Sequence, residues 1–491
     1  MSKTTSADRP LVIILLGASG DLALKKVIPA LFALYSRRLL RERVRFVGYA
    51  RSPMTTEAFR ERIMAHLTCR YVPGEKCDDW ISRFLDRCTY VSGQYDSPDD
   101  LRRLQEIVRP SDADTPVDRI FYMAIPPFLF LDVAQSLAGA GLVTGSAESG
   151  WSRVVIEKPF GRDRASSDEL TRNMTRVFTE EQTYRIDHYL GKEVIQNLLV
   201  LRFANLIFDP IWNRAHIEQV KISWMEDIGL EGRAGYFDDY GIIRDVMQNH
   251  LLQILALVAM EQPVRLEAGY VRDEKVKALR CVQPVTVEDL VTGQYTAGAL
   301  EGRRRLGYLE EEGIPAGSVT PTYAAAALHV RNRRWDGVPF LIRAGKALNA
   351  RMTEIRIRFR PVPGNIFLHA AGHLANNELI IRVQPDAAIT FRIVNKVPGL
   401  GITLEESDLD LQYASAFPVQ IPDAYECLLL DVIEGDRSLF IRADELAAAW
   451  DIFTPVLHEL ATRGTKPRPY SFGSAGPEAA QALAARYGAT W

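Results

Sequence analysis

Three short segments of the chain combine cationic, imidazole, phenol and carboxylate side chains. They are Glu-Lys-Pro-Phe-Gly at 157–161, Arg-Ile-Asp-His-Tyr-Leu-Gly-Lys-Glu at 185–193, and a stretch at 241–255 that contains Asp245 and His250. Side chains of these types can bind an anion or transfer a proton when the fold brings them together. Each segment can also be interpreted as ordinary structure without a chemical role. The spacing of the residues decides between these two interpretations only in part.

The segment 185–193 resembles a phosphate receptor. His188 and Lys192 are four residues apart and Tyr189 is three residues from Lys192, so the spacing predicts that all three lie on one face of a helix running on to Val200. A helix N-terminus beside a cation, an imidazole and a phenol suits a phosphate group. The alternative is a solvated first turn with Asp187 as its N-cap, and spacing alone favours that alternative.

His250 shares a helical stripe with apolar residues at positions 243, 247 and 254. A histidine on such a stripe is more often a satisfied core residue than a catalyst. A half-buried imidazole paired with a carboxylate is also how a general base near neutral pH is made, and spacing leaves both interpretations open.

Lys158 ends a predicted parallel strand, at the carboxyl edge where open α/β sheets bind ligands. The Lys158-Pro159 bond is a candidate for the cis form, because X-Pro bonds adopt that geometry at little cost. The alternative for Lys158 is an ordinary surface lysine, and the segment by itself favours neither.

A glycine turn follows the aliphatic segment Leu11–Leu16, which reads as a buried parallel strand, and precedes a predicted helix from Leu22 to Arg38. Between a strand and a helix, the spacing G-x-x-G-x-x-A favours a dinucleotide site over a turn that binds nothing. The residues predicted to contact the cofactor there are Gly17, Ser19, Gly20, Asp21, Leu22 and Lys26. The second strand ends without the acid typical of NAD sites and is followed by Arg51 and Ser52, which favours NADP.

The surrounding pattern predicts two domains of different class. Strands and helices alternate to about residue 185, as in a doubly wound parallel sheet, and beyond 210 longer strands with period two indicate a large, mainly antiparallel sheet. We expect a Rossmann-like domain over 1–186 and an α+β domain over 187–491. The predicted later strands are 354–360, 378–383, 389–394 and 427–433, and the predicted helices are 242–260, 322–332 and 444–463.

Composition sets limits on function. Sixty-two acidic against fifty-nine basic side chains give a net charge of -3, which argues against a nucleic-acid or membrane-surface binder. The N-terminus has no apolar signal segment, and five cysteines without a Cys-x-x-Cys pair favour a reduced, cytoplasmic chain. His369 and His373 have metal-ligand spacing but no evident third ligand, so we predict no metal site.

Five segments together resemble the glucose-6-phosphate dehydrogenase family, in its order and spacing: 17–23, 157–161, 185–193, 241–250 and Gly-Lys-Ala-Leu at 345–348. The resemblance runs from about residue 11 to at least 460. It implies oxidation of D-glucose 6-phosphate at C1 to 6-phospho-D-glucono-1,5-lactone, with hydride transfer to NADP, at the entry to the oxidative pentose phosphate pathway. It also implies an active site between the two domains and a homodimer or homotetramer built through the antiparallel sheet.

The resemblance also implies roles for single residues. His250 is expected to be the general base and Asp187 the carboxylate that orients it. The expected substrate contacts are Lys158, which also touches the cofactor, and His188, Tyr189, Lys192, Glu226, Asp245, Lys346, Arg351 and Gln384.

Two rival functions remain open at this stage. Another two-domain sugar oxidoreductase would share the strand-end Lys-Pro but lack the His-Tyr-x-x-Lys cluster. An NADP-sensing regulator would have no reason to keep Asp187, His250 and Lys158 together.

Overall fold

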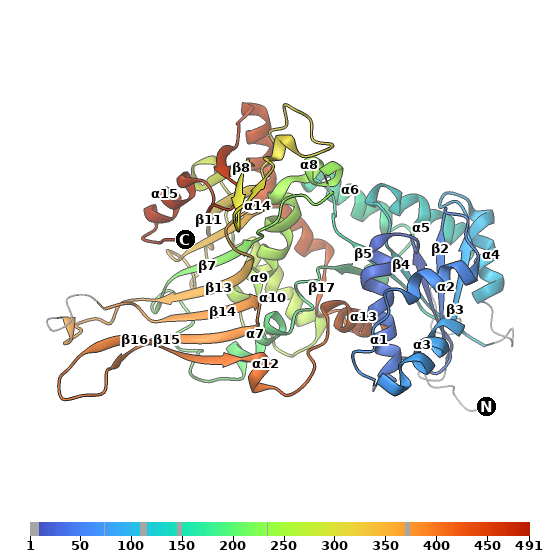
Figure 1. Ribbon diagram of the computed structural model, residues 1–491, viewed down its shortest axis with the longest axis horizontal. Helices are drawn as coiled ribbons and strands as arrows, with labels where there is room; N and C mark the ends of the chain where they lie inside the picture. Colours follow the sequence, from blue (N-terminus) through green and yellow to red (C-terminus); the bar gives the residue numbers. More distant parts are fainter. Residues whose placement is uncertain (1–8, 73, 109–114, 145–149, 233, 369–373) are drawn as a thin grey trace.

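The computed structural model describes residues 9–72, 74–108, 115–144, 150–232, 234–368 and 374–491. Two sheets organise them, one built mainly from the N-terminal part of the chain and the other from the C-terminal part (Figure 1). The predicted fold class, a Rossmann-like sheet plus an α+β part with a mainly antiparallel sheet, is confirmed. Among the described residues, no helix is both long enough and apolar enough to cross a bilayer.

The first sheet has seven strands in the order β17-β6-β5-β4-β1-β2-β3, and all of them run parallel except β17. Their bounds are β1 Leu11–Leu16, β2 Val44–Ala50, β3 Cys88–Ser92, β4 Asp118–Met123, β5 Ser152–Glu157, β6 Thr183–Ile186 and β17 Phe440–Ile441. Every residue of β1 is buried, as an aliphatic strand covered on both faces requires. The predicted bounds of β1 match the observed ones.

Helices cover both faces of this sheet. Alternate residues of β1 pack on opposite sides: Val12 and Ile14 against one layer, Leu11 and Ile13 against the other. The first layer contains α4 (Pro98–Val108), α5 (Phe130–Gly139) and α6 (Arg164–Met174). The second contains α1 (Ile28–Ser36), α2 (Thr56–Met64), α3 (Cys77–Asp86) and α13 (Ala424–Glu434). The predicted helix from Leu22 is interrupted, since a π-helical segment, Ala23–Val27, precedes α1.

The predicted strand 427–433 is wrong, because these residues lie within helix α13. The apolar residues of this run form the buried face of a helix, since Leu428, Leu429 and Val432 are buried at helical spacing. Asp423 caps the N-terminus by accepting a hydrogen bond from the Tyr425 backbone N–H, and Gly435 ends the helix in a left-handed conformation. A segment from the C-terminal part of the chain therefore packs on the Rossmann-like sheet.

The second sheet has nine strands in the order β16-β15-β14-β13-β7-β12-β11-β8-β18. Most neighbours are antiparallel, while β12 runs parallel to β7 and β18 parallel to β8. Its strands are β7 Ile217–Met225, β8 Leu290–Thr296, β11 Tyr323–His329, β12 Pro339–Gly345, β13 Met352–Phe359, β14 Glu378–Gln384, β15 Ala388–Lys396, β16 Leu404–Gln412 and β18 Arg468–Ser471. The β15–β16 hairpin projects from the end far from the first sheet (Figure 1). A separate pair is formed by β9 (Gly298–Leu300) and β10 (Arg303–Arg305).

The predicted helix 322–332 is also wrong, because β11 occupies most of it. Alanine favours helices, but Ala324 to Ala327 are fully buried between β12 and β8, where a small side chain fits and tertiary packing overrides propensity. The remaining helices are α7 Glu193–Phe203, α8 Ala234–Ile242, α9 Leu252–Ala259, α10 Ala268–Arg280, α12 Tyr413–Ala416, α14 Ala443–Arg463 and α15 Glu478–Arg486. The predicted helix 444–463 is thus confirmed as α14.

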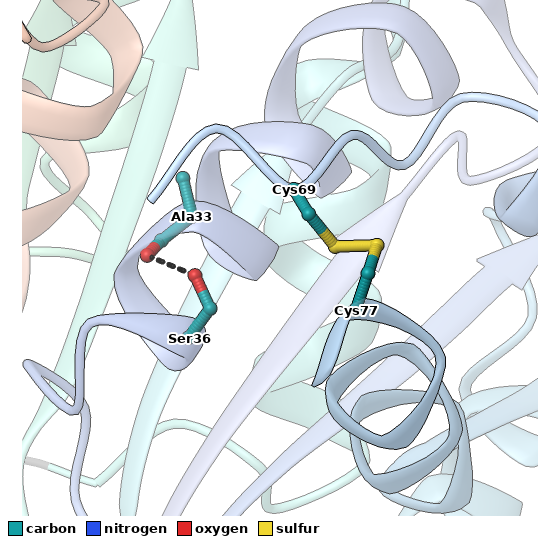
Figure 2. The surroundings of a disulfide bond; sticks show 4 residues. All are labelled: Ala33, Ser36, Cys69 and Cys77. Atoms are coloured by element: carbon teal, nitrogen blue, oxygen red, sulfur yellow. Dashed lines mark hydrogen bonds between the residues drawn. A yellow bond between two sulfur atoms is a disulfide. The ribbon is translucent and has the colours of Figure 1, made fainter. Parts of the chain in front are cut away.

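A disulfide joins Cys69 to Cys77, which corrects the expectation that the cysteines stay reduced. Figure 2 shows the bond beside α1, where the Ser36 hydroxyl donates to the carbonyl of Ala33 at 3.0 Å. The loop between α2 and α3 folds back so that the two Cα atoms lie 5.7 Å apart, within the range that a disulfide spans. The spacing of Cys69 and Cys77 in the sequence does not by itself predict that the two residues meet.

Candidate active site

A cavity of about 650 Å³ lies between the two sheets. On one side it is lined by residues at the carboxyl ends of β5 and β6, on the other by residues at the ends of β7, β12 and β14, and α13 contributes a third wall. It gathers most of the predicted site residues: Leu22, Lys26, Lys158, His188, Tyr189, Lys192, Glu226, Asp245, His250, Lys346, Arg351 and Gln384.

The first sheet places its residues at strand ends. Lys158 follows β5 directly, and its bond to Pro159 is cis. His188, Tyr189 and Lys192 lie in the turn between β6 and α7, so the prediction of a common helical face is wrong. Backbone bonds within the turn and the Asp187 carboxylate, which accepts from the Tyr189 N–H at 2.9 Å, hold it in shape. The turn brings these side chains to the cavity without a helix.

The second sheet brings four residues to the same place through strand pairing. Because β7 and β12 are parallel and in register at Met225 and Gly345, the residues that follow them, Glu226 and Lys346, emerge together. Because β13 and β14 are antiparallel, the start of β13 lies beside the end of β14. This pairing places Arg351, which precedes β13, near Gln384, the last residue of β14. Their separation in sequence is large, and only the sheet register brings them together.

His250 is buried on a π-helical segment, Ile243–Leu251, and its side chain is 2% exposed. Its Nδ1 lies 2.5 Å from Oδ1 of Asp187. Since an ionised carboxylate only accepts hydrogen bonds, Nδ1 carries the proton and Nε2 keeps a lone pair. His250 therefore differs from a core histidine whose two ring nitrogens are both hydrogen-bonded. Its imidazole lines the cavity, and its Nε2 can still accept a hydrogen bond.

Electrostatics keep this pair as a carboxylate and a neutral imidazole. Burial opposes ionisation of Asp187, but its hydrogen bond with His250, and the charge that His250 carries at the acidic pH where Asp187 titrates, lower the pKa of Asp187 to about 2. Burial lowers the pKa of His250, and nearby Lys158 acts in the same direction, against the pull of Asp187. A neutral imidazole near pH 7 can accept a proton.

Two of the lysines are already paired with carboxylates. Lys158 Nζ donates to the Asp245 carboxylate at 2.9 Å, and Lys346 Nζ donates to Glu226 at 2.5 Å. Burial alone would raise the pKa of Asp245, but the charge and hydrogen bond of Lys158 lower it below its usual value. Asp245 is therefore a carboxylate in this pair.

Lys192 instead donates to the neutral amide oxygen of Gln384 at 2.6 Å. Burial lowers the pKa of Lys192, and the charges of Arg351 and Lys26 act in the same direction, against the opposing charge of Asp423. An anion bound among these three cations would relieve their mutual repulsion. This end of the cavity is therefore suited to a phosphate group.

The glycine turn has the geometry that close approach of a ligand to the backbone requires. Gly17 has φ +87°, and a Cβ there would lie 2.2 Å from the carbonyl oxygen of Ala124. Its N–H donates to the Tyr49 carbonyl of β2, so the turn abuts the end of the second strand. The Ser19 and Ser52 hydroxyls lie 3.4 Å apart there, and the exposed Arg51 guanidinium covers the Tyr95 ring. Gly17, Ser19, Gly20, Asp21 and Arg51 thus lie beside the cavity wall formed by Leu22 and Lys26.

Several cavity residues were not predicted. Trp224 donates its indole N–H to the Tyr189 hydroxyl, which also bonds Thr353 at 3.2 Å. Tyr425 stacks on His188 from α13. The others include Glu157, Tyr236, Phe237 and Asp423. Glu157 lies in the segment 157–161, which its side-chain types single out in the sequence. Tyr425 lies in helix α13, most of which was predicted to be the strand 427–433.

Ligand atoms of Asp187, His188 and His250 lie within 4.8 Å of one another, a spacing that a metal could also use. The hydrogen bond between Asp187 and His250 already accounts for two of the three. The pair His369 and His373 lies outside the described residues.

Family models for the two parts of one enzyme match nearly the whole chain. "Glucose-6-phosphate dehydrogenase, NAD binding domain" matches residues 14–197, and "Glucose-6-phosphate dehydrogenase, C-terminal domain" matches residues 199–491. The chain belongs to the glucose-6-phosphate dehydrogenase family.

Individual members of the glucose-6-phosphate dehydrogenase family are closely similar. Chloroplastic glucose-6-phosphate 1-dehydrogenase 1 of Arabidopsis thaliana is 53% identical, over 99% of this chain and 84% of that protein. Glucose-6-phosphate 1-dehydrogenase of Dictyostelium discoideum is 47% identical, over 99% and 96%. A solved glucose-6-phosphate dehydrogenase in complex with its substrate glucose-6-phosphate is 42% identical and superposes with a TM-score of 0.91 over 100% of both chains.

Proposed function

We propose that this chain oxidises D-glucose 6-phosphate at C1 to 6-phospho-D-glucono-1,5-lactone and transfers the hydride to NADP, the entry step of the oxidative pentose phosphate pathway. The observation that carries the proposal is one cavity with a neutral imidazole held by a buried carboxylate and, in the same space, Lys192, which donates to the neutral amide of Gln384, beside Arg351 and Lys26. The first arrangement serves proton removal and the second serves phosphate binding.

His250 is the general base in this proposal. Its Nε2 accepts the proton of the C1 hydroxyl while the hydride leaves C1, so that no full positive charge develops on the sugar. Asp187 holds the imidazole in the tautomer that leaves Nε2 free, and it stabilises the imidazolium that forms. The Nδ1 to Oδ1 bond is therefore strongest when the base carries the proton.

The phosphate end of the substrate is bound by His188, Tyr189, Lys192 and Arg351. Burial, with His250 close by, lowers the pKa of His188 well below its usual range, so its neutral ring binds by donating an N–H. Lys158, Glu226, Asp245, Lys346 and Gln384 contact the sugar, where carboxylates and ammonium groups can hydrogen-bond its hydroxyls. These contacts fix C1 relative to the base, which is a positioning effect.

The glycine turn fits NADP. A Cβ at position 17 would clash with the Ala124 carbonyl, so glycine is needed for the tight turn that we assign to the diphosphate at Gly17 and Gly20, and Arg51 with Ser52 suits a ribose phosphate. Ser19, Asp21, Leu22, Lys26 and Lys158 complete the proposed cofactor contacts. Bound NADP would supply the hydride acceptor, which the side chains of the cavity lack.

We assign cofactor binding to a domain of residues 1–186, and substrate binding and assembly to residues 187–491. We further propose a cytoplasmic homodimer or homotetramer built through the second sheet. The edge strand β16 supports this assembly because its outer side is unpaired and it exposes Leu409 and Leu411. Light scattering on the purified protein would give the subunit number. Cell fractionation would test the location, since relatives from Arabidopsis thaliana and Solanum tuberosum are named chloroplastic.

The test of the activity is the absorbance at 340 nm when purified protein meets NADP and glucose 6-phosphate. NADPH formation with this substrate, and little or none with free glucose, supports the proposal. Equal rates with both sugars would contradict the assigned phosphate contacts, and no NADPH with either would contradict the function.

A further inference from the structure

Glu157 is a carboxylic acid in the cavity wall that the proposed chemistry does not use. It is the last residue of β5, next to Lys158, whose amino group points instead to Asp245. Two phenols face its carboxylate: Tyr122 of β4 donates at 2.5 Å, and the hydroxyl of Tyr425 of α13 lies close enough to lower the pKa of Glu157. One carboxyl group thus connects the Rossmann-like sheet to a helix from the C-terminal part of the chain.

Tyr425 continues this connection to the substrate end of the cavity. Its ring stacks on the ring of His188, with centroids 6.3 Å apart and an interplanar angle of 8°. The His188 ring also meets the His250 ring edge-on, with centroids 4.8 Å apart. The orientation of His188 is therefore set on one side by the base and on the other by Tyr425.

We propose that Glu157 is a positioning residue for the phosphate end of the cavity, and that only its ionised carboxylate anchors Tyr425 and thereby the ring of His188. This inference rests on the proposed function of His188 as a phosphate contact. An ionised carboxylate accepts from both phenols, whereas a protonated one carries a donor of its own and satisfies the two less well.

The surroundings of Glu157 bring the protonation of its carboxylate close to neutral pH. Burial raises the pKa of Glu157 to about 7, although the hydrogen bonds from Tyr122 and Tyr425 oppose that rise. The charged groups that face it are Lys158, which favours the carboxylate, and Asp187, which disfavours it. As the pH falls through this value, the anchor weakens and the affinity for substrate should fall.

The test compares the KM for glucose 6-phosphate of the parent and of Glu157→Gln between pH 5.5 and 8.5. Titration of the substrate phosphate occurs with both proteins, so the ratio of the two KM values isolates Glu157. We expect the ratio to be about threefold to tenfold at pH 8.5, the scale of one ordinary hydrogen bond, because the glutamine can still accept a bond from one phenol. It should approach one at pH 5.5, because the parental side chain is then neutral as well, and kcat should change less than KM.

Two single-atom variants test the path through Tyr425. Tyr425→Phe keeps the ring on His188 but removes the anchor, so the KM should rise at pH 8.5. Tyr122→Phe removes the other phenol, which acts on the anchor only through the pKa of Glu157, and should raise the KM at pH 8.5 less than Tyr425→Phe does. This comparison remains decisive if Glu157→Gln does not fold.

The results that overturn the inference differ from those that overturn the function. An active parent whose KM ratio is one, or is the same at every pH, refutes the role of Glu157, since a mere loss of packing would not titrate. Equal effects of Tyr425→Phe and Tyr122→Phe refute the path. A parent that forms no NADPH from glucose 6-phosphate refutes the proposed function and, with it, this inference.

Discussion

Asp187 and His250 are 63 residues apart in sequence, yet their side chains meet at 2.5 Å and each is 2% exposed. Asp187 is the first residue after β6, and His250 lies on a π-helical segment of the C-terminal part of the chain. A buried carboxylate that lacked this imidazole would be costly, as would a buried imidazolium without the carboxylate. The pair therefore depends on both parts of the chain at once.

The first prediction concerns the phosphate end. Lys192→Ala should raise the KM for glucose 6-phosphate strongly and change kcat less, because a charge-assisted contact contributes about 1.5–3 kcal/mol. Steady-state kinetics with varied substrate measure this. Lys277→Ala, at an exposed lysine of α10 paired with Glu274, is the control and should behave as the parent. A parental KM for Lys192→Ala would remove Lys192 from the phosphate site.

The second prediction concerns cofactor choice. Arg51→Ala should weaken NADP and leave NAD almost untouched, since NAD carries a hydroxyl where NADP carries the 2′-phosphate. The KM values for the two cofactors, each at saturating glucose 6-phosphate, measure the effect, and Arg83→Ala at an exposed arginine of α3 is the control. Equal losses for both cofactors would mean that Arg51 contacts the diphosphate or supports the fold.

The third prediction is a pH profile. A base works only when neutral, so kcat/KM should be lost as pH falls through the pKa of His250 in the free enzyme. Burial lowers that pKa, so the acidic limb should lie below the ordinary histidine value of about 6.5. Asp187→Asn removes the group that raises the pKa of His250, and the limb should then move to still lower pH. Because Glu157 also titrates near pH 7 and changes KM, the profile is measured on Glu157→Gln as well, and a limb above pH 7 that persists in this variant would contradict the assignment of His250.

The fourth prediction concerns stability away from the cavity. Lys275 and Glu445 form an ion pair at 2.8 Å with side chains 1% and 0% exposed, between α10 and α14. Glu445→Gln leaves the ammonium buried without its counter-charge, which should cost about 3–5 kcal/mol of unfolding free energy. Denaturant unfolding measures it. Glu459→Gln breaks an exposed pair on the same helix and should cost less than about 1 kcal/mol. Similar losses for both variants would contradict the burial argument.

Sequence reasoning was most successful where a motif sits at the end of a strand. Lys158 follows β5 and the glycine turn follows β1, because parallel strands bring their carboxyl ends to one edge whatever the rest of the chain does. His188 and Lys192 reach the cavity as predicted, although a turn and not a helix places them. Residue type was a better guide to the site than the expected local structure.

Residues brought together only by tertiary contacts could not be found this way. Tyr425 reaches His188 because α13 packs on the first sheet, and the apolar run at 427–433 fits a strand as well as a helix. The alanine-rich strand β11 shows the reverse error, since burial between two strands overrode helix propensity. The unusual environment of Glu157 follows from Tyr122 and Tyr425, neither of which is near it in sequence.

The central claim is tested most directly by the turnover of His250→Asn beside the parent, with NADP and saturating glucose 6-phosphate, followed at 340 nm. Asparagine is close in size and can still hydrogen-bond to Asp187, but it cannot take the proton. We predict that the parent forms NADPH and that kcat of the folded variant falls by about two to four orders of magnitude, with modest change in substrate binding. A folded variant with near-parental kcat, or a parent that leaves glucose 6-phosphate unoxidised, would contradict the account.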